Sequence, residues 1–476
     1  MQQSKESFRV GIIGVAGASV ALYLSQMGLD ITLFESSKSL LDGPPICHLH
    51  AGGNLYREIS DSQCVQLLHE SIEFMRLLPD AIDYRPTVVA VPKEDKGTPE
   101  DLLGRLDILV AEYKRIIAED ENSRCMGEPQ NYYRTFTRAE LEALSKLDSQ
   151  QQPQSLEEWM IPFAKGVDLN RLQFPVILVQ EYGINIFRVA ANLSLALERS
   201  KNVRVLRERS VKSIDSSSNN FRVTYSSHTK EEEMAFDYII NAAGFKSGMI
   251  DDMLGYKRRR FVEFKAAYVT ECPQFTESWP EIIFHGERGT PRGMAQFTPY
   301  PQSHFQLHGM TQEITLFEDG LVKSTERSSQ PVLKHEFEKM IYSGWSTSEV
   351  KSRTKNAITY LASFIPEFEG AKVVERPLYG AQQIPGEDAT LRAADVSFEG
   401  ERYARCEIVK ASSVVSIADK IAKHLSHIVE IEVDTKREIL NSIERVEESH
   451  ISSLATHLAE ERGYPAALGD RCFHRA

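Results

Sequence analysis

The sequence predicts an α/β protein, α+β overall, in which a parallel-sheet domain is combined with an antiparallel-sheet domain and a helical insertion. Residues 8–35 have the pattern of a strand, a glycine turn, a helix and a second strand, which is a βαβ unit. From Val203 onward the apolar residues recur with a period of two, which is typical of antiparallel strands with one face in water. Much later than the first turn, a buried strand ends in the small residues of Asn241-Ala-Ala-Gly244, where a backbone can pass close to a ligand.

Composition excludes several classes of protein. The 476 residues are 42% hydrophobic and 26% charged, as in ordinary globular proteins. The net charge of −13 argues against a nucleic-acid partner, and we expect the basic run at residues 257–260 to be the solvated start of a strand. We expect neither a signal peptide nor a membrane span, since the first apolar run is interrupted by glycines and no apolar run reaches about 18 residues. The six cysteines lack C-x-x-C spacing, which suits free thiols in a reducing cytoplasm.

The βαβ unit has the features of a dinucleotide site. The free N–H groups and the dipole at the start of its helix favour a pyrophosphate. Glu35, at the tip of the second strand, is placed to accept hydrogen bonds from a ribose diol. The residues expected to hold these groups are Gly14, Val15, Ala16, Gly17, Glu35 and Ser36.

The glycine pattern of this turn is incomplete. Ile12 stands where G-x-G-x-x-G has its first glycine, and two glycines are missing after Ile13 compared with the longer form of the turn. A shorter turn leaves less room for a pyrophosphate. A βα unit that binds no nucleotide is therefore the alternative.

The region that follows the βαβ unit is largely helical. Residues 61–78 have the apolar spacing of a helix, and residues 84–92 that of a strand. Residues 99–160 are mostly helical, with a capping box formed by Thr137 and Glu140. This stretch predicts a helical insertion that lies over a site.

The second half of the chain predicts strands followed by helices. Strands are expected at residues 203–206, 211–214, 221–225, 234–240, 266–270, 281–285, 294–298 and 305–308. Helices are expected at residues 331–363, 412–424 and 428–461, with loop and strand at 376–386.

Several segments resemble the D-amino-acid-oxidase-like superfamily of FAD-dependent oxidoreductases. They are the glycine-rich start, Glu181-Tyr-Gly-Ile-Asn185 ahead of a helix, Asn241–Gly244, and the helical start at Lys410–Asp419. In this superfamily the last of these directs a helix N-terminus at the flavin pyrimidine ring, where it stabilises the negative charge of the reduced flavin. Within the superfamily, the strongest similarity is to malate:quinone oxidoreductase.

The resemblance implies FAD as the cofactor and a Rossmann-type FAD-binding domain assembled from separate segments. The expected boundaries are 1–90, 176–250 and 375–426 for the FAD-binding domain, 91–175 and 251–374 for the helical insertion and substrate domain, and 427–476 for a C-terminal helical tail. Beyond the βαβ unit, the resemblance implies FAD contacts from Gly52, Gly53, Val211, Ala242, Ala243, Gly244, Ala411, Ser412 and Ser413.

Residues 47–54, Cys-His-Leu-His-Ala-Gly-Gly-Asn, lie where these enzymes run a loop along the flavin. His48 and His50 are two residues apart, so one imidazole can face the active site while the other faces away. Three roles stay open for them: catalysis or substrate orientation, a structural hydrogen bond, and a histidyl-linked flavin or metal site. We expect no metal, since further ligands at suitable spacing are missing.

Two other segments supply candidate site residues. Strand alternation puts His308 on one face with other polar residues, where they line a pocket or face water. Arg376 can clamp a substrate carboxylate through two hydrogen bonds or form a surface ion pair with Glu375 or Asp388. Further cationic candidates are Arg392, Arg405 and Lys410.

We therefore expect a cytoplasmic FAD-dependent oxidoreductase that acts on a small molecule. A hydride would pass from a C–H beside the amine or hydroxyl of a small amino or hydroxy acid, or a related amine or alcohol, to flavin N5. His50, His48 or His308 would handle the proton and Arg376 would hold the acid, with oxygen or a quinone as electron acceptor. One alternative is a quinone-linked dehydrogenase in peripheral contact with the membrane. The other is a non-catalytic binding scaffold with impaired FAD binding.

Overall fold

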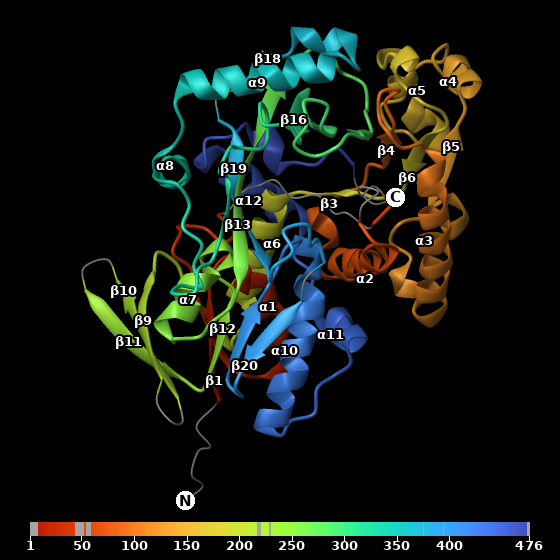
Figure 1. The fold of residues 1–476 in the computed structure, drawn as a ribbon. Coiled ribbons are helices and arrows are strands. Elements are labelled where there is room, and N and C mark those ends of the chain that lie inside the picture. The colour runs from red at the N-terminus through yellow and green to blue at the C-terminus, as the bar shows by residue number, and fades with distance from the viewer. Residues whose placement is uncertain are drawn as a thin grey trace, which may run out of the picture.

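The computed structural model describes residues 8–42, 52–53, 59–216, 220–227, 230–374, 376–393 and 395–473. A six-stranded and a ten-stranded sheet form its framework (Figure 1). The predicted combination of a Rossmann-type domain with an antiparallel-rich substrate domain is confirmed.

The six-stranded sheet contains the βαβ unit. Its order is β20-β21-β12-β1-β2-β8, and within it only β20 runs antiparallel to its neighbour. The strands are β1 (Arg9–Ile13), β2 (Asp30–Phe34), β8 (Val203–Leu206), β12 (Tyr238–Asn241), β20 (Val396–Glu399) and β21 (Tyr403–Cys406). Because β1 and β12 are parallel neighbours, Ile13 pairs with Asn241 and the two following turns meet at one edge of the sheet.

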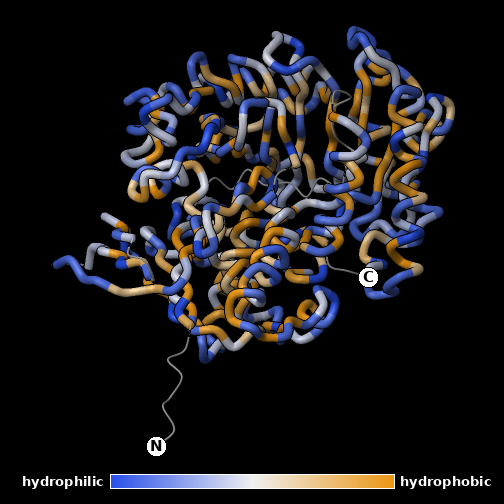
Figure 2. The backbone as a smooth tube through the Cα atoms, turned by 60° about the horizontal axis from the view of Figure 1, so that its bottom comes forward, coloured by the Kyte–Doolittle hydropathy of each residue, from blue (hydrophilic) through white to orange (hydrophobic). Residues whose placement is uncertain are grey.

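Helices cover this sheet and bury its apolar face. They are α1 (Gly17–Leu24), α2 (Asp61–Leu77), α6 (Ile186–Arg199) and α10 (Val414–Val429). Helix α1 packs against both α6 and α10, and all eight of its residues are buried. Figure 2 shows the apolar segments gathered in the interior and the hydrophilic ones at the periphery.

The ten-stranded sheet forms the substrate half. Its main path is β17-β13-β16-β15-β14-β4-β6-β5, and β18 and β19 also pair with β13. The strands are β4 (Thr87–Ala90), β5 (Tyr133–Phe136), β6 (Val176–Val179), β13 (Arg260–Glu271), β14 (Glu281–Phe284), β15 (Ala295–Tyr300), β16 (His304–Gly309), β17 (Leu321–Lys323), β18 (Lys372–Val373) and β19 (Leu378–Pro385). The pairing is antiparallel except between β4 and β14.

The remaining elements surround the two sheets. The helices are α3 (Glu100–Glu119), α4 (Arg138–Leu144), α5 (Leu156–Gly166), α7 (Ser247–Met253), α8 (His335–Ser343), α9 (Thr347–Ala362), α11 (Lys436–Ser442) and α12 (Glu448–Glu461). Two small sheets consist of β9 (Val211–Ser216), β10 (Phe221–Ser226) and β11 (Glu231–Phe236), and of β3 (Ile82–Asp83) and β7 (Gly183–Ile184). No helix among the described residues is long and apolar enough to cross a membrane.

Most predicted elements are found, with instructive differences. The capping box at the start of α4 is present in full. The strand expected at 234–240 is two strands, because Asp237 separates β11 from β12 and its carboxylate accepts a hydrogen bond from the Arg9 backbone N–H at 2.8 Å. Strand β8 pairs in parallel with β2 and is not part of the antiparallel region. The helical insertion also contributes strands, since β5 and β6 extend the substrate sheet.

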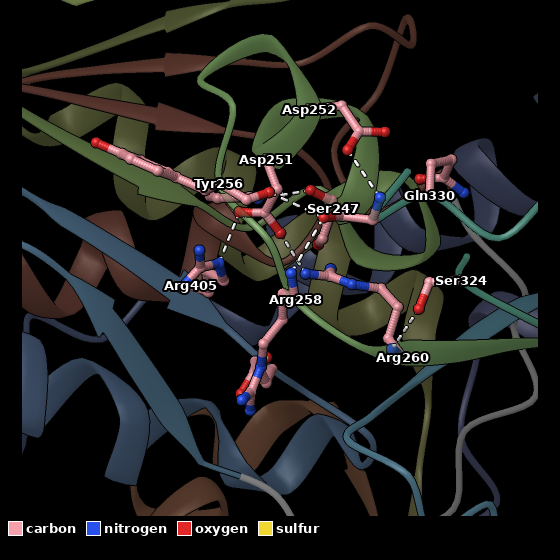
Figure 3. A network of polar contacts seen from close by, with 12 residues as sticks. Ser247, Asp251, Asp252, Tyr256, Arg258, Arg260, Ser324, Gln330 and Arg405 are labelled. Atoms are coloured by element: carbon pink, nitrogen blue, oxygen red, sulfur yellow. Dashed lines mark hydrogen bonds and ion pairs between the residues drawn. The ribbon is translucent and has the colours of Figure 1, made fainter. Parts of the chain in front are cut away.

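The basic run at residues 257–260 is not fully solvated, which corrects the prediction. Arg260 is only 2% exposed and pairs with the buried carboxylate of Asp251 on α7 (Figure 3). The Asp251 carboxylate also accepts hydrogen bonds from Arg405 Nε at 2.6 Å and from Tyr403 Oη at 2.8 Å. Since Arg260 starts β13 while Tyr403 and Arg405 belong to β21, this network ties the two large sheets together.

Candidate active site

A cavity of about 1000 Å³ extends from the edge of the six-stranded sheet to the ten-stranded sheet. We call the part next to the βαβ unit the turn side; it is lined by Gly14, Val15, Ala16, Glu35, Ser36, Val211, Ala243 and Gly244. We call the part next to the substrate sheet the sheet side; it is lined by Lys265, Gln296, His308, Gln382, Gln383 and Arg392. Lys410, Ala411 and Val414, at the start of α10, line the same cavity.

The glycine turn passes very close to the end of β12. Gly14 has φ +105°, and a Cβ placed there would lie 2.4 Å from Ala243 Cα. A Cβ at Gly17 would meet the side chain of Ile12 at 2.6 Å, so this glycine lets α1 pack directly on β1. The turn therefore needs glycine at positions 14 and 17. The side chain of Ile12 packs against α1 at Gly17.

Glu35 lies at the tip of β2, as the sequence predicts, and its side chain is fixed. Its Oε1 accepts a hydrogen bond from the Ser37 backbone N–H at 2.9 Å. Glu35 is only 4% exposed, and burial raises the pKa of its carboxyl group. A ribose hydroxyl that donates to this carboxylate would replace the water that burial removes.

The other predicted FAD contacts divide into two groups. Val211, Ala243, Gly244 and Ala411 line the cavity, and Ala242 supports the turn because its carbonyl accepts the Ala16 N–H at 3.2 Å. The second group does not belong to the described residues that line the cavity. Its members are Gly52, Gly53, Ser412 and Ser413.

The structure gives the second group packing roles. Gly52, with φ +109°, lies against the backbone of Cys64 on α2. The Gly53 N–H donates to Glu181 Oε1 at 2.7 Å, which anchors this point of the loop to the strand end. Ser413 Oγ donates to the Lys410 carbonyl at 2.8 Å inside the first turn before α10. These contacts of Gly52, Gly53 and Ser413 lie within the protein, and the FAD contacts predicted for the four residues stay predictions.

The candidate catalytic residues are placed as follows. His308 lies on β16, 7% exposed, and lines the cavity opposite Gln296 of β15. Arg376 lies at the cavity wall with its guanidinium carbon 5.0 Å from the centre of the Tyr464 ring. It forms no ion pair with another described residue, so the alternative of a surface pair with Asp388 is not found, and Glu375 lies outside the described residues. His48 and His50 lie outside the described residues.

The cationic candidates Arg392, Lys410 and Arg405 differ in position. Arg392 and Lys410 line the cavity, whereas Arg405 is held in the Asp251 network and is not among the described lining residues. Its charge therefore serves the packing of the two sheets. The prediction of no metal is not contradicted: within the described ranges no group of His, Cys, Asp or Glu side chains could hold a metal ion.

Sequence reasoning missed Lys265, the buried cation of the sheet side. Its Nζ donates to Gln382 Oε1 at 2.7 Å and pairs with Glu263 Oε2 at 3.0 Å. Burial lowers the pKa of this ammonium group. Glu263 also pairs with Arg288, and although burial opposes it, these two cations hold the pKa of the Glu263 carboxyl below its usual value.

A lysine between apolar residues in the middle of a strand was the available signal for Lys265. It interrupts the run Phe264-Lys-Ala-Ala-Tyr268 of β13, and its strand neighbours Phe264 and Ala266 belong to the core on the other face.

These features define a class of protein. An open parallel sheet carries a glycine turn and a ribose-type carboxylate at one edge, and a cavity leads from them to a second, mixed sheet with polar side chains. This is the arrangement of a two-domain dinucleotide-dependent enzyme. The residues present fit an adenine dinucleotide, because the cradle at Gly14 has no room for a side chain and the adjoining cavity is large.

The chain belongs to the FAD dependent oxidoreductase family, whose model matches residues 10–376. FAD is therefore its cofactor and the chain is an enzyme, which removes the scaffold alternative. No curated protein sequence matches the chain significantly.

Solved structures of low identity share the fold. Glycine oxidase from Geobacillus kaustophilus is 14% identical with a TM-score of 0.52, over 93% of this chain and 100% of that one. L-amino acid deaminase from Proteus vulgaris is 11% identical with a TM-score of 0.57, over 92% and 97%. Glycerol-3-phosphate dehydrogenase from Bacillus halodurans, solved with FAD, is 12% identical with a TM-score of 0.56, over 97% and 74%.

Proposed function

We propose that this FAD-dependent oxidoreductase oxidises a small amino or hydroxy acid, or a related amine or alcohol, at the C–H next to the nitrogen or oxygen. One observation carries the proposal: a single cavity joins the turn side to a sheet side that is lined by the cationic side chains of Lys265 and Arg392. Bound FAD supplies the hydride acceptor at N5.

The sheet side suits an acidic substrate. The Glu263 carboxylate interacts electrostatically with Lys265, Arg288 and Arg392. Two of these cations, Lys265 and Arg392, line the cavity. A substrate carboxylate bound there would meet charge-assisted donors in a site of low dielectric, which strengthens the attraction.

His308 is the described residue best placed to take the proton from the substrate amine or hydroxyl. It is buried, lines the sheet side, and lies directly across from Gln296, which can orient the same polar group. Arg376 is the alternative acid clamp, since it lines the cavity and forms no ion pair among the described residues.

The test is reduction of the bound flavin without oxygen. We expect that amino or hydroxy acids bleach the visible flavin absorbance of the holoenzyme and that the matching amines or alcohols without the acid group act more weakly. Lys265→Met should lower kcat/KM for the acid by about tenfold to hundredfold, because a charged hydrogen bond is lost, and should abolish the preference for the acid.

Lys257→Met is the matched control for Lys265→Met. Lys257 precedes the same strand, donates to the exposed Arg327 carbonyl and is not among the described lining residues, so kcat/KM should be unchanged. No bleaching by any amino or hydroxy acid would overturn the proposed substrate class. If Lys265→Met keeps the preference for the acid, another residue binds the substrate carboxylate, and Arg376 is the next residue to replace.

A quinone acceptor is the second candidate for the oxidative half of the reaction. Met249 and Tyr342, both lining the cavity, are 46% and 60% exposed and give its mouth an apolar rim. This rim suits an apolar acceptor better than a purely polar mouth would. Reoxidation of the reduced enzyme by a short-chain quinone but not by oxygen would support it, and rapid reoxidation by oxygen alone would exclude it.

A further inference from the structure

Three backbone amides of the glycine turn donate hydrogen bonds to carbonyl groups of the protein itself. The N–H groups of Gly14, Ala16 and Gly17 donate to the carbonyls of Phe34 at 3.0 Å, Ala242 at 3.2 Å and Gly14 at 2.9 Å. No side chain caps the first turn of α1. Amides at such a turn normally serve the diphosphate. The short turn therefore offers the anion fewer donors, and positive charge for it has to come from elsewhere.

A buried arginine of the C-terminal tail lies at this part of the cavity. Arg462 directly follows α12, lines the cavity and is 9% exposed. Its Nη1 donates to the Leu41 carbonyl at 3.1 Å, and its Nη2 donates to the Leu40 carbonyl at 2.9 Å and to Ser39 Oγ at 2.9 Å. Arg462 thus fixes the segment that follows Glu35.

One donor of the Arg462 guanidinium, Nε, makes no hydrogen bond to another described residue. This Nε is buried, and Asp42 Oδ1 lies 3.5 Å away. The carboxylates that act on it electrostatically are those of Asp42, Glu461 and Glu35. Because Glu35 marks the ribose position, Arg462 lies where its charge can act on the turn side of the cavity.

A second contact of the tail reaches the opposite wall of the cavity. Tyr464 Oη donates to the Pro377 carbonyl at 2.9 Å, and the Arg376 guanidinium lies over the Tyr464 ring. The tail itself is anchored on α6, because Asn185 Nδ2 donates to the carbonyls of Leu468 and Asp470, each at 2.8 Å. Residues 462–464 therefore bridge the loop after β2 and the start of β19.

We propose that the C-terminal tail completes the cofactor site: Arg462 supplies the positive charge that the shortened glycine turn lacks for the FAD diphosphate. The hydrogen bonds of Tyr464 and Asn185 fix the position of the tail, and so keep Arg462 at the cavity. The assignment concerns the cofactor alone and is independent of the substrate and of the electron acceptor.

Arg462→Gln tests the assignment by cofactor binding. We expect the dissociation constant for FAD, measured by flavin fluorescence on the deflavinated protein, to rise about tenfold to hundredfold, as for loss of a charged hydrogen bond. ADP and adenosine are compared as competitors. In the wild type ADP should displace FAD at lower concentration than adenosine, and Arg462→Gln should remove this difference, since only ADP carries the diphosphate.

Arg471→Gln is the matched control. Arg471 is also a buried tail arginine, 7% exposed, and donates to the backbone carbonyls of Pro79 and Ile82, but it is not among the described residues that line the cavity. We expect this variant to lose stability without losing the preference for ADP. Arg462→Lys, which keeps the charge, should retain part of the preference, and it replaces Arg462→Gln if that variant does not fold.

Three results would overturn the proposal. They are an unchanged FAD dissociation constant in Arg462→Gln, an equal loss of FAD binding in Arg471→Gln, and an ADP preference that persists without the arginine. Substrate bleaching of wild-type flavin is unaffected by these outcomes, so the proposed function can stand or fail separately.

Discussion

Glu70 lies on α2 and is only 2% exposed. Gln66 donates to one of its carboxylate oxygens at 2.8 Å, and the other oxygen is buried without a hydrogen bond among the described residues. Burial, with Glu73 and Asp395 nearby, raises the pKa of Glu70 to about 7. A carboxyl group is thus kept protonated in the folded protein at a pH where it would be ionised in the unfolded chain.

This shift predicts a pH-dependent stability. Between the unfolded pKa near 4.5 and the folded pKa of about 7, the folded state binds more protons, so its stability falls as the pH rises. Relative to Glu70→Gln, the wild type should lose about 2 kcal/mol of unfolding free energy from about pH 5 to about pH 8. Urea unfolding at both pH values measures it.

The control for Glu70 is a carboxylate on the surface. Glu119 on α3 is 65% exposed, so Glu119→Gln should leave the difference between the two pH values as in the wild type. A difference between wild type and Glu70→Gln that is the same at both pH values would contradict the pKa shift.

At the scale of elements, the turn between β1 and α1 has the strictest geometry. Gly14→Ala places a Cβ 2.4 Å from Ala243 Cα in a left-handed backbone conformation, so the turn must move away from β12. We expect a loss of several kcal/mol of stability and of bound FAD, which thermal unfolding and the flavin content of the purified protein would measure.

Gly28→Ala offers a matched comparison in the same βαβ unit. Gly28 also has a left-handed backbone, with φ +71°, but a Cβ there would meet nothing within 4 Å. Its replacement should cost about 1 kcal/mol and leave the flavin content unchanged. Equal losses in the two variants would show that backbone strain alone, and not the approach to β12, governs the turn.

The C-terminal tail is the element whose role differs most from its sequence pattern. The charged, helical pattern of residues 428–461 predicts a tail on the surface of the protein. In the structure α12 packs on α6, and Arg462 and Tyr464 reach the cavity wall. Nothing in the helical periodicity indicates these contacts, because they depend on where α6 and β19 lie.

At the scale of the whole molecule, the Asp251 network joins the cofactor and substrate halves (Figure 3). Asp251→Asn removes the carboxylate that pairs with Arg260 and Arg405. It leaves the buried Arg260 guanidinium without an ion-pair partner among the described residues, whereas Arg405 keeps its pair with Glu399 at 3.0 Å. We expect a loss of about 3–5 kcal/mol in the free energy of unfolding, as for breaking a buried ion pair. Urea unfolding followed by fluorescence measures it.

Asp252→Asn is the neighbouring control for Asp251→Asn. The Asp252 carboxylate accepts hydrogen bonds from Ser328 and Ser329 at a partly exposed site, so its loss should cost about 1 kcal/mol. A cost for Asp251→Asn no greater than that for Asp252→Asn would mean that the Asp251 ion pairs do not hold the two halves together.

The sequence by itself determined the βαβ unit, the position of Glu35 and most strands, because these follow from local periodicity and from residues a few positions apart. The FAD cofactor came from the resemblance of separate segments to a known family. Strand alternation also indicated His308 as a candidate site residue, and residue type indicated Arg376. Their catalytic roles, like those of His48 and His50, stay predictions.

Only the tertiary structure decided which residues share the cavity. It placed Lys265, Arg462 and Tyr464 at the walls of the cavity, held Arg405 in the Asp251 network, and gave the Gly53 N–H a hydrogen bond to Glu181. The physical reason is that burial and charge pairing arise between segments hundreds of residues apart, whose meeting is set by sheet order and helix packing and leaves no mark on local spacing.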